Sequence, residues 1–206
     1  MQKKQKSATQ FFSDWADKGK DIGMAAAHEP AVNEILKFTF QKHNKPFSFI
    51  DAGCGNGWVV RKVRAMPLCK KAIGLDGAAS MINNAKKIDP SGEYFCTNLF
   101  DWIPDVKFDI VHSMEVFYYF KEPEQIVNFI IKNWIKPGGS LIIGLDHYYE
   151  NPKSHSWAKD LNLGMSLLTE QDWLKIFKTV GFKNCMTWRA NAHGEFSGTL
   201  VVYGNN

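Results

Sequence analysis

One segment restricts the fold of this chain more than any other: a run of alternating glycines directly after a short apolar stretch. Residues 47–50 read Phe-Ser-Phe-Ile, and residues 51–57 read Asp-Ala-Gly-Cys-Gly-Asn-Gly. Because they lack Cβ, Gly53, Gly55 and Gly57 let the backbone turn sharply and approach a ligand closely. An apolar strand that runs through such a turn into a helix is typical of nucleotide- and nucleoside-binding α/β domains.

The rest of the chain alternates between strand-like and helix-like segments. Apolar runs predict strands at 47–50, 71–75, 93–96, 108–113, 140–145, 185–189 and 198–203. Apolar spacing and end signals predict helices at 9–18, 30–43, from the glycine turn to about 65, 78–88, 123–135 and 169–180. In this pattern Pro30 begins the second helix, Pro137 begins a turn, and Thr169 caps the last helix.

This alternation predicts βαβ units and therefore a largely parallel sheet with helices on both faces. The last two predicted strands are separated only by residues 190–197. That connection is too short for a crossover helix, so these two strands should pair antiparallel. We expect an α/β fold with a mostly parallel sheet of about seven strands and an antiparallel C-terminal strand.

Composition excludes several classes of protein. The 206 residues suit a single domain, and 45% apolar with 22% charged residues is an ordinary globular composition. A net charge of +4 without a basic stripe gives no indication of nucleic-acid binding. No apolar run approaches the roughly 18 residues of a membrane span, and no signal peptide is visible, so we expect a cytoplasmic protein. The four scattered cysteines form no C-x-x-C pair, which predicts no metal site.

A second carboxylate stands at the end of the next predicted strand. Asp76 follows Asp51 by close to the roughly 20-residue step of nucleoside-binding βαβ units, where an acid accepts hydrogen bonds from ribose hydroxyls. The dinucleotide pattern G-x-G-x-x-G is absent, because Gly57 stands one position early and residue 58 is Trp. A carboxylate directly before the glycines also suits a cationic amine better than a pyrophosphate.

These segments together resemble the class I S-adenosylmethionine-dependent methyltransferases. FIDAGCGNGW resembles the first motif of that superfamily, and LDGA, FDIVHSMEVFYYF and IKPGGSLIIG follow in the expected order. The resemblance covers roughly residues 46–205 and is strongest to small-molecule methyltransferases. It implies a Rossmann-like core over residues 46–206, an N-terminal helical lid over residues 1–45, and S-adenosylmethionine as the cofactor.

The resemblance also implies a role for individual residues. Asp51 and Gly53 would hold the methionine amino end of the donor, and Asp76 would bind the ribose. The remaining donor contacts would come from Gly55, Gly57, Gly77, Asn98, Leu99 and Ser113. Asn98 departs from the family pattern, which more often has Asp at the position that touches the adenine amino group.

The acceptor site should lie beside the donor, in the loop that follows the fifth strand. Methyl transfer from a sulfonium is a direct displacement, so a base is needed only where the acceptor still carries a proton. Two histidines of this loop, His147 and His155, are candidate bases. Candidate walls of the acceptor pocket are Trp15, His28, Phe117, Tyr148 and Trp157.

Three functions remain open at this point. The first is methylation of a small molecule, which the modest charge favours. The second is methylation of protein or RNA, which is less favoured because no Asn-Pro-Pro-Tyr-like segment follows the fourth strand. The third is a catalytically silent partner protein, since a fold does not guarantee an activity. The sequence predicts neither the acceptor atom nor the oligomeric state.

Overall fold

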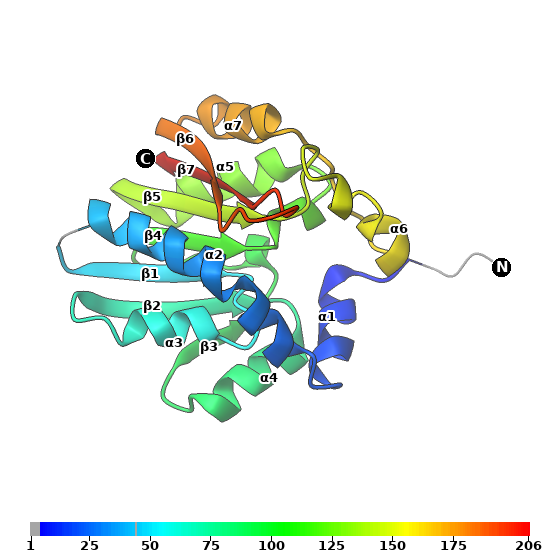
Figure 1. Ribbon diagram of the computed structural model, residues 1–206. Helices are drawn as coiled ribbons and strands as arrows, with labels where there is room; N and C mark the ends of the chain where they lie inside the picture. The colour runs from blue at the N-terminus through cyan, green and yellow to red at the C-terminus, as the bar shows by residue number, and fades with distance from the viewer. Residues whose placement is uncertain (1–4, 44) are drawn as a thin grey trace.

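The computed structural model describes residues 5–43 and 45–206 and contains a seven-stranded sheet (Figure 1). The spatial order is β3-β2-β1-β4-β5-β7-β6. The strands are β1 (Phe47–Ala52), β2 (Cys69–Asp76), β3 (Glu93–Cys96), β4 (Phe108–Met114), β5 (Ile135–Leu145), β6 (Lys183–Ala190) and β7 (Thr199–Asn205). Neighbours from β3 to β5 pair parallel, while β7 pairs antiparallel with both β5 and β6. The predicted mostly parallel sheet with an antiparallel C-terminal strand is confirmed.

Helices cover both faces of this sheet. They are α1 (Ala8–Ala16), α2 (Asp21–Lys42), α3 (Trp58–Arg64), α4 (Ala79–Ile88), α5 (Pro123–Asn133), α6 (Trp157–Leu161) and α7 (Glu170–Thr179). Short 3₁₀ turns are η1 (Leu99–Asp101), η2 (Phe117–Tyr119) and η3 (Pro152–Ser154). Apolar side chains of α2, α3 and α4 fill one side of the sheet, and those of α5 and α7 fill the other. Within the described residues, no helix is long and apolar enough to cross a membrane.

The second helix is longer than the sequence predicts. It begins at Asp21, so the prediction that Pro30 starts it is wrong. Proline inside a helix removes one backbone hydrogen bond, and the carbonyl that loses its partner belongs to the residue four positions earlier, Ala26. Ala26 and Pro30 are both exposed, so water can satisfy that carbonyl.

The fifth strand also differs from its prediction. Residues 137–139 were predicted as a turn, but they lie inside β5, which begins at Ile135. The backbone N–H of Gly138 donates to the carbonyl of Asn206 at 2.9 Å, and the N–H of Asn206 donates to Gly139 at 2.9 Å. These long-range bonds to the C-terminal end of the chain extend the strand through a segment that would turn if it were alone.

The last helix begins with a reciprocal cap that stabilises it. The Thr169 hydroxyl accepts from the N–H of Asp172, and the Asp172 carboxylate accepts from the N–H of Thr169, at 3.1 Å each. We expect Thr169→Ala to lower the free energy of unfolding by about 1 kcal/mol, because the cap bond is lost. Urea unfolding measures this change. Ser156→Ala is the matched control, since Ser156 precedes α6 without a side-chain cap bond; an equal loss in both variants would contradict the prediction.

Candidate functional site

The glycine turn at the end of β1 lies beside a buried pair formed by an acid and a histidine. Asp51 of β1 and His112 of β4 are direct neighbours in the parallel register. The Oδ1 atom of Asp51 lies 2.7 Å from Nδ1 of His112, and both residues are buried. A buried carboxylate without a partner is costly, so this bond allows Asp51 to stand at the C-terminal edge of the sheet.

Sequence reasoning missed His112. In the apolar segment 108–113, His112 looks like a residue that simply packs in the core. Only the register between β1 and β4 reveals that Asp51 is its partner. Its ring also stacks on Phe49, with centroids 5.9 Å apart, while Nε2 has no partner among the described residues. The ring therefore fixes one carboxylate oxygen of Asp51.

Asp76 ties the end of β2 to the same turn. Its carboxylate accepts from the backbone N–H of Gly55 at 2.9 Å and from that of Ala78 at 2.8 Å. Burial raises the pKa of Asp76 above its ordinary value, although these backbone donors oppose the rise. The structure thus brings the two predicted carboxylates, Asp51 and Asp76, to the ends of neighbouring strands around one glycine.

The three glycines of the turn differ in what they face. A Cβ at Gly53 would collide with the side chain of Val116, and one at Gly57 would collide with the ring of Tyr94. A Cβ at Gly55 would meet only the Met81 sulfur, at 3.9 Å. All three have positive φ. Packing therefore requires glycine at positions 53 and 57, whereas a Cβ at position 55 would not collide with any neighbour.

The N-terminal helix α1 lies across this end of the sheet (Figure 1). The side chain of Thr9 packs on Gly77, and the Ser13 hydroxyl accepts from the N–H of Ser80 at 3.1 Å. The ring of Phe12 meets Tyr119 edge-on, with centroids 5.5 Å apart. The half-buried Trp15, a predicted pocket wall, belongs to the same helix. Helix α1 of the predicted N-terminal lid is therefore in contact with residues on both sides of the glycine turn.

Three further residues predicted at the donor have other contacts in this structure. Asn98 is exposed, and its side-chain oxygen accepts from the N–H of Phe100 at 3.0 Å. Leu99 is buried in the core. Ser113 is buried and donates to the carbonyl of Ala52 at 2.6 Å, which joins β4 to β1. Their contacts with the donor stay predictions.

A second pair of carboxylates lies between β4 and β5. Glu115 has a positive φ of 61°, and its carboxylate accepts from the Tyr118 hydroxyl at 2.8 Å and from the N–H of Asp146. Asp146 in turn accepts from the Thr199 hydroxyl at 2.6 Å and lies 3.9 Å from Nδ1 of His28. A strained backbone at a half-buried acid such as Glu115 often marks a functional site. The predicted pocket residue His28 is thus brought to a carboxylate.

These two acids hold their protons more strongly than usual. Burial, and then the charge of Asp146, raise the pKa of Glu115 well above its ordinary value. Burial also raises the pKa of Asp146 and lowers that of His28, while their mutual attraction opposes both shifts. No periodic pattern in the sequence indicates this cluster, because the contact depends on the unusual backbone at Glu115.

The two candidate bases have different surroundings. His147 is buried, and its Nδ1 lies 3.0 Å from the carbonyl of Ser154. A carbonyl only accepts, so Nδ1 carries the proton and Nε2 of the neutral ring keeps a lone pair, without a partner among the described residues. Burial lowers the pKa of His147. His155 is exposed, and its Nε2 lies 2.8 Å from the carbonyl of Tyr149.

The remaining predicted pocket residues divide between core and loop. Phe117 and Tyr148 are fully buried, and the Tyr148 hydroxyl donates to the carbonyl of Gly198 at 2.8 Å. Neither side chain reaches solvent in this structure. Trp157 is half-buried and stacks on His147, with centroids 6.1 Å apart. The structure therefore brings His147 and Trp157 together in this loop, while His155 packs beside Tyr149, with ring centroids 5.6 Å apart.

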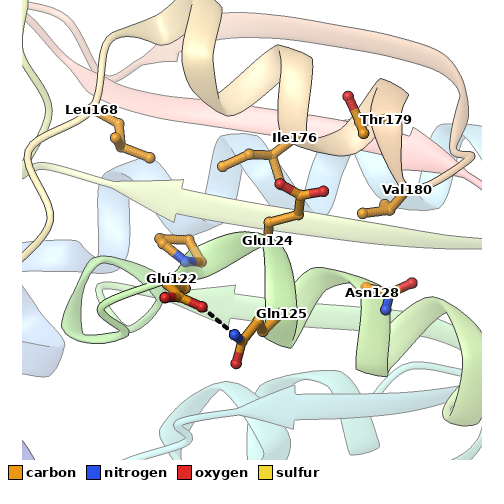
Figure 2. Close-up of a pocket in the computed structure, with 9 residues that line it drawn as sticks. Glu122, Glu124, Gln125, Asn128, Leu168, Ile176, Thr179 and Val180 are labelled. Carbon is orange, nitrogen blue, oxygen red and sulfur yellow. Dashed lines mark hydrogen bonds between the residues drawn. The ribbon is translucent and has the colours of Figure 1, made fainter.

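A surface hollow of about 580 Å³ lies elsewhere, between α5 and α7 (Figure 2). Its walls include Glu122, Glu124, Asn128 and Ile176, and none of the predicted site residues lines it. Backbone donors, a glycine turn and paired carboxylates all lie at the ends of β1 and β2 instead. We therefore place the candidate site at those strand ends.

Comparisons with known proteins show the family to which this fold belongs. A family model described as a methyltransferase domain matches residues 24–186. The trans-aconitate 2-methyltransferase of Azoarcus sp. is 25% identical over 112 residues, which are 54% of this chain and 43% of that protein. The chain spans about half the length of the curated relatives it matches.

Two solved structures share the fold. One is a putative methyltransferase of Haloferax volcanii in complex with the Trm112 methyltransferase activator, with a TM-score of 0.83 and 23% identity; the alignment covers 94% of this chain and 96% of that one. The other is DhpI in complex with S-adenosylhomocysteine, with a TM-score of 0.69 and 15% identity, covering 95% and 94% of the two chains.

The Asp51–His112 pair leads to a stability prediction. His112→Leu leaves a buried carboxylate without its donor, so the free energy of unfolding should fall by about 3 kcal/mol. Chemical denaturation measures it. The matched control is His43→Leu, which removes a bond of 3.0 Å to the neutral Ser140 hydroxyl and should cost about 1 kcal/mol. Equal losses in the two variants would show that the Asp51–His112 bond contributes no more than an ordinary neutral hydrogen bond.

Proposed function

Because the chain belongs to the methyltransferase-domain family, whose class I members use S-adenosylmethionine as cofactor, we propose that it transfers a methyl group to a small molecule. The observation that carries the proposal is the pair of carboxylates, Asp51 and Asp76, on either side of the open Gly55. Acceptor oxygens on both sides of a half-buried backbone turn suit a ligand with an amino group at one end and hydroxyls at the other.

The residues of the turn fit that donor. Asp51, oriented by His112, would attract the amino group of the methionine part, and Ser113 would lie nearby. Asp76 would accept from the ribose hydroxyls with the lone pairs that Gly55 and Ala78 leave free. Gly77, Asn98 and Leu99 would border the adenine. The bound donor supplies a sulfonium methyl group that is open to direct displacement, so these residues need only bind and orient it.

The loop after β5 would form the acceptor side. His147 is the candidate base, because its Nε2 lone pair has no partner among the described residues and its lowered pKa keeps the ring neutral. His155 would serve only in a rearranged loop. Trp15, His28, Phe117, Tyr148 and Trp157 would shape the pocket and exclude water, with α1 as the cover.

Charge at the pocket favours particular acceptors. Asp146 lies 3.9 Å from Nδ1 of His28, and Glu115 accepts from the backbone N–H of Asp146. An anionic acceptor would gain no attraction from two acids that are neutral, and it would be repelled by either acid that is ionised. We propose that the acceptor is neutral or cationic rather than a tricarboxylate such as trans-aconitate. An assay of methyl transfer to a panel of amines, alcohols and tricarboxylates tests both the activity and this preference. The amount of S-adenosylhomocysteine formed measures the reaction. Donor binding without turnover on any acceptor would favour a silent partner protein.

We also propose that the chain works together with a small protein activator. The support is its likeness to the Haloferax volcanii methyltransferase, which was solved in complex with Trm112 and has the higher TM-score of the two structures compared above, 0.83 against 0.69. Co-purification of the two proteins at a fixed ratio, with a higher kcat in the complex, tests this second proposal.

The donor site leads to a binding prediction. Asp76→Ala should weaken S-adenosylhomocysteine binding about tenfold to 150-fold, because hydrogen bonds to a charged group contribute about 1.5–3 kcal/mol. Titration calorimetry measures the dissociation constant. Asp109→Ala is the matched control: it removes a half-buried carboxylate bound to Ser48 and Lys136 near the opposite end of the sheet. A folded Asp76→Ala variant with unchanged affinity would refute the role of Asp76.

The two histidines lead to a kinetic prediction. If His147 is the base, His147→Ala should lower kcat about 10²–10⁴-fold and leave donor affinity unchanged. His155→Ala should change kcat little, since its side chain is exposed. A base must be unprotonated, so kcat should stay constant from neutral pH down to the lowered pKa of His147 and fall only below it. Equal losses in both variants, or a larger loss at His155, would remove His147 from this role.

A further inference from the structure

A buried carboxylate of helix α2 binds to the glycine turn. Asp21 is the first residue of α2, and it is only 5% exposed. Its Oδ2 atom accepts from Nδ2 of Asn56 at 2.9 Å, and Asn56 stands between Gly55 and Gly57. A longer contact of 3.5 Å joins the same Oδ2 to Nδ2 of Asn84. One buried oxygen therefore joins three segments that lie far apart in the sequence.

The two asparagines belong to the two connections that follow the donor carboxylates. Asn56 lies in the turn between Asp51 at the end of β1 and helix α3, and Asn84 lies in α4, which follows Asp76 and β2. The proposed donor site spans the ends of these two strands. A contact that joins the turn and α4 at one point therefore helps to fix the two halves of that site relative to each other.

The side-chain amide of Asn56 is oriented by this carboxylate. An ionised carboxylate only accepts hydrogen bonds, so the amide turns its nitrogen toward Asp21. The amide oxygen, Oδ1, is buried and has no partner among the described residues. A buried acceptor without a partner is unfavourable, and a bond to a charged group is stronger than one between neutral groups. The bond to Asp21 therefore determines which way the Asn56 amide points.

The start of a helix does not by itself explain the burial of Asp21. Free N–H groups in the first turn of α2 favour an acid there, but an exposed acid would serve equally, as Glu124 does in the first turn of α5. No lysine, arginine or histidine among the described residues forms an ion pair with Asp21. The partners of the buried carboxylate are instead the amides of Asn56 and Asn84.

We propose that Asp21 is a positioning residue for the methyl donor: it fixes Asn56, and through Asn56 the glycine turn, in the conformation that binds S-adenosylmethionine. The inference rests on the proposed function. Asp21 acts through Asn56 and needs no contact of its own with the donor. Its loss should let the turn adopt other conformations, and donor affinity should fall because the binding conformation is then only partly populated.

Helix α2 keeps other contacts when Asp21 is replaced. Val32 and Ile35 of the same helix are fully buried in the core. The carboxylate of Glu29 forms an ion pair with Lys62 of α3 at 3.0 Å, with both side chains partly exposed. We therefore expect variants of Asp21 to fold, and Glu29 provides a matched control because it also joins α2 to the segment after the turn.

The test measures binding of S-adenosylhomocysteine to the full chain by titration calorimetry. Asp21→Ala should weaken binding about tenfold, since a bond to a charged group is lost. Asn56→Asp should weaken it at least as much, because two carboxylates would then face each other. The double variant with Asp21→Asn and Asn56→Asp restores an amide-to-carboxylate bond in the opposite direction, and its affinity should return to within about threefold of the parent chain. Glu29→Gln should leave the affinity unchanged.

Recovery in the double variant is the decisive result, because a merely structural role would not produce it. Urea unfolding of every variant provides the comparison. Donor affinity that follows the free energy of unfolding, or a double variant weaker than both single ones, overturns the inference, and so does unchanged affinity in a folded Asp21→Ala variant. If Asp21→Ala does not fold, Asp21→Asn replaces it with an expected loss of about fivefold, and an unchanged affinity there has the same meaning.

The parent chain separates this inference from the proposed function. If the parent chain binds S-adenosylhomocysteine and the variants of Asp21 bind it equally well, only the positioning role is wrong. If the parent chain does not bind S-adenosylhomocysteine, the proposed function is refuted and the positioning role falls with it.

Discussion

The structure depends on how the chain leaves β1 at the C-terminal edge of the sheet. At Gly53 and Gly57 the backbone passes so close to Val116 and Tyr94 that no Cβ fits. A carboxylate, Asp51, stands at this crowded position, and a histidine from β4 compensates its burial. Between Gly53 and Gly57, the Cβ position of Gly55 remains free of collisions. The turn therefore combines tight packing with one unfilled backbone position, which is the geometry that a ligand site requires.

Most of the fold could be predicted because its signals are local. Apolar runs marked the strands, the short connection before β7 predicted its antiparallel pairing, and Thr169 with Asp172 marked the start of α7. The errors arose where distant contacts override local preference. Gly138 and Gly139 belong to β5 because Asn206 pairs with them, and Pro30 is tolerated inside α2 because its side of the helix faces water.

The candidate site could be predicted from the sequence only in part. Asp51, Gly55 and Asp76 belong to one motif and its strand ends, so their spacing was sufficient. His112 was not predictable, because its role depends on the register between β1 and β4. The sequence also offers no way to distinguish His147 from His155 as a base, since both lie in one loop. Burial separates them, and burial of one loop residue depends on the packing of Tyr118 and Trp157 around it.

The carboxylates of this edge are stabilised in two different ways, and the difference suggests a division of work. Asp76 is held by fixed backbone N–H groups, which favour its charged form and oppose the effect of burial on its pKa. Glu115 faces another acid, Asp146, and its pKa rises further. A fixed anion suits a ligand that is always bound in the same way. We infer that the pair Glu115 and Asp146, whose carboxylates accept from the Tyr118 and Thr199 hydroxyls, belongs to the acceptor side of the site.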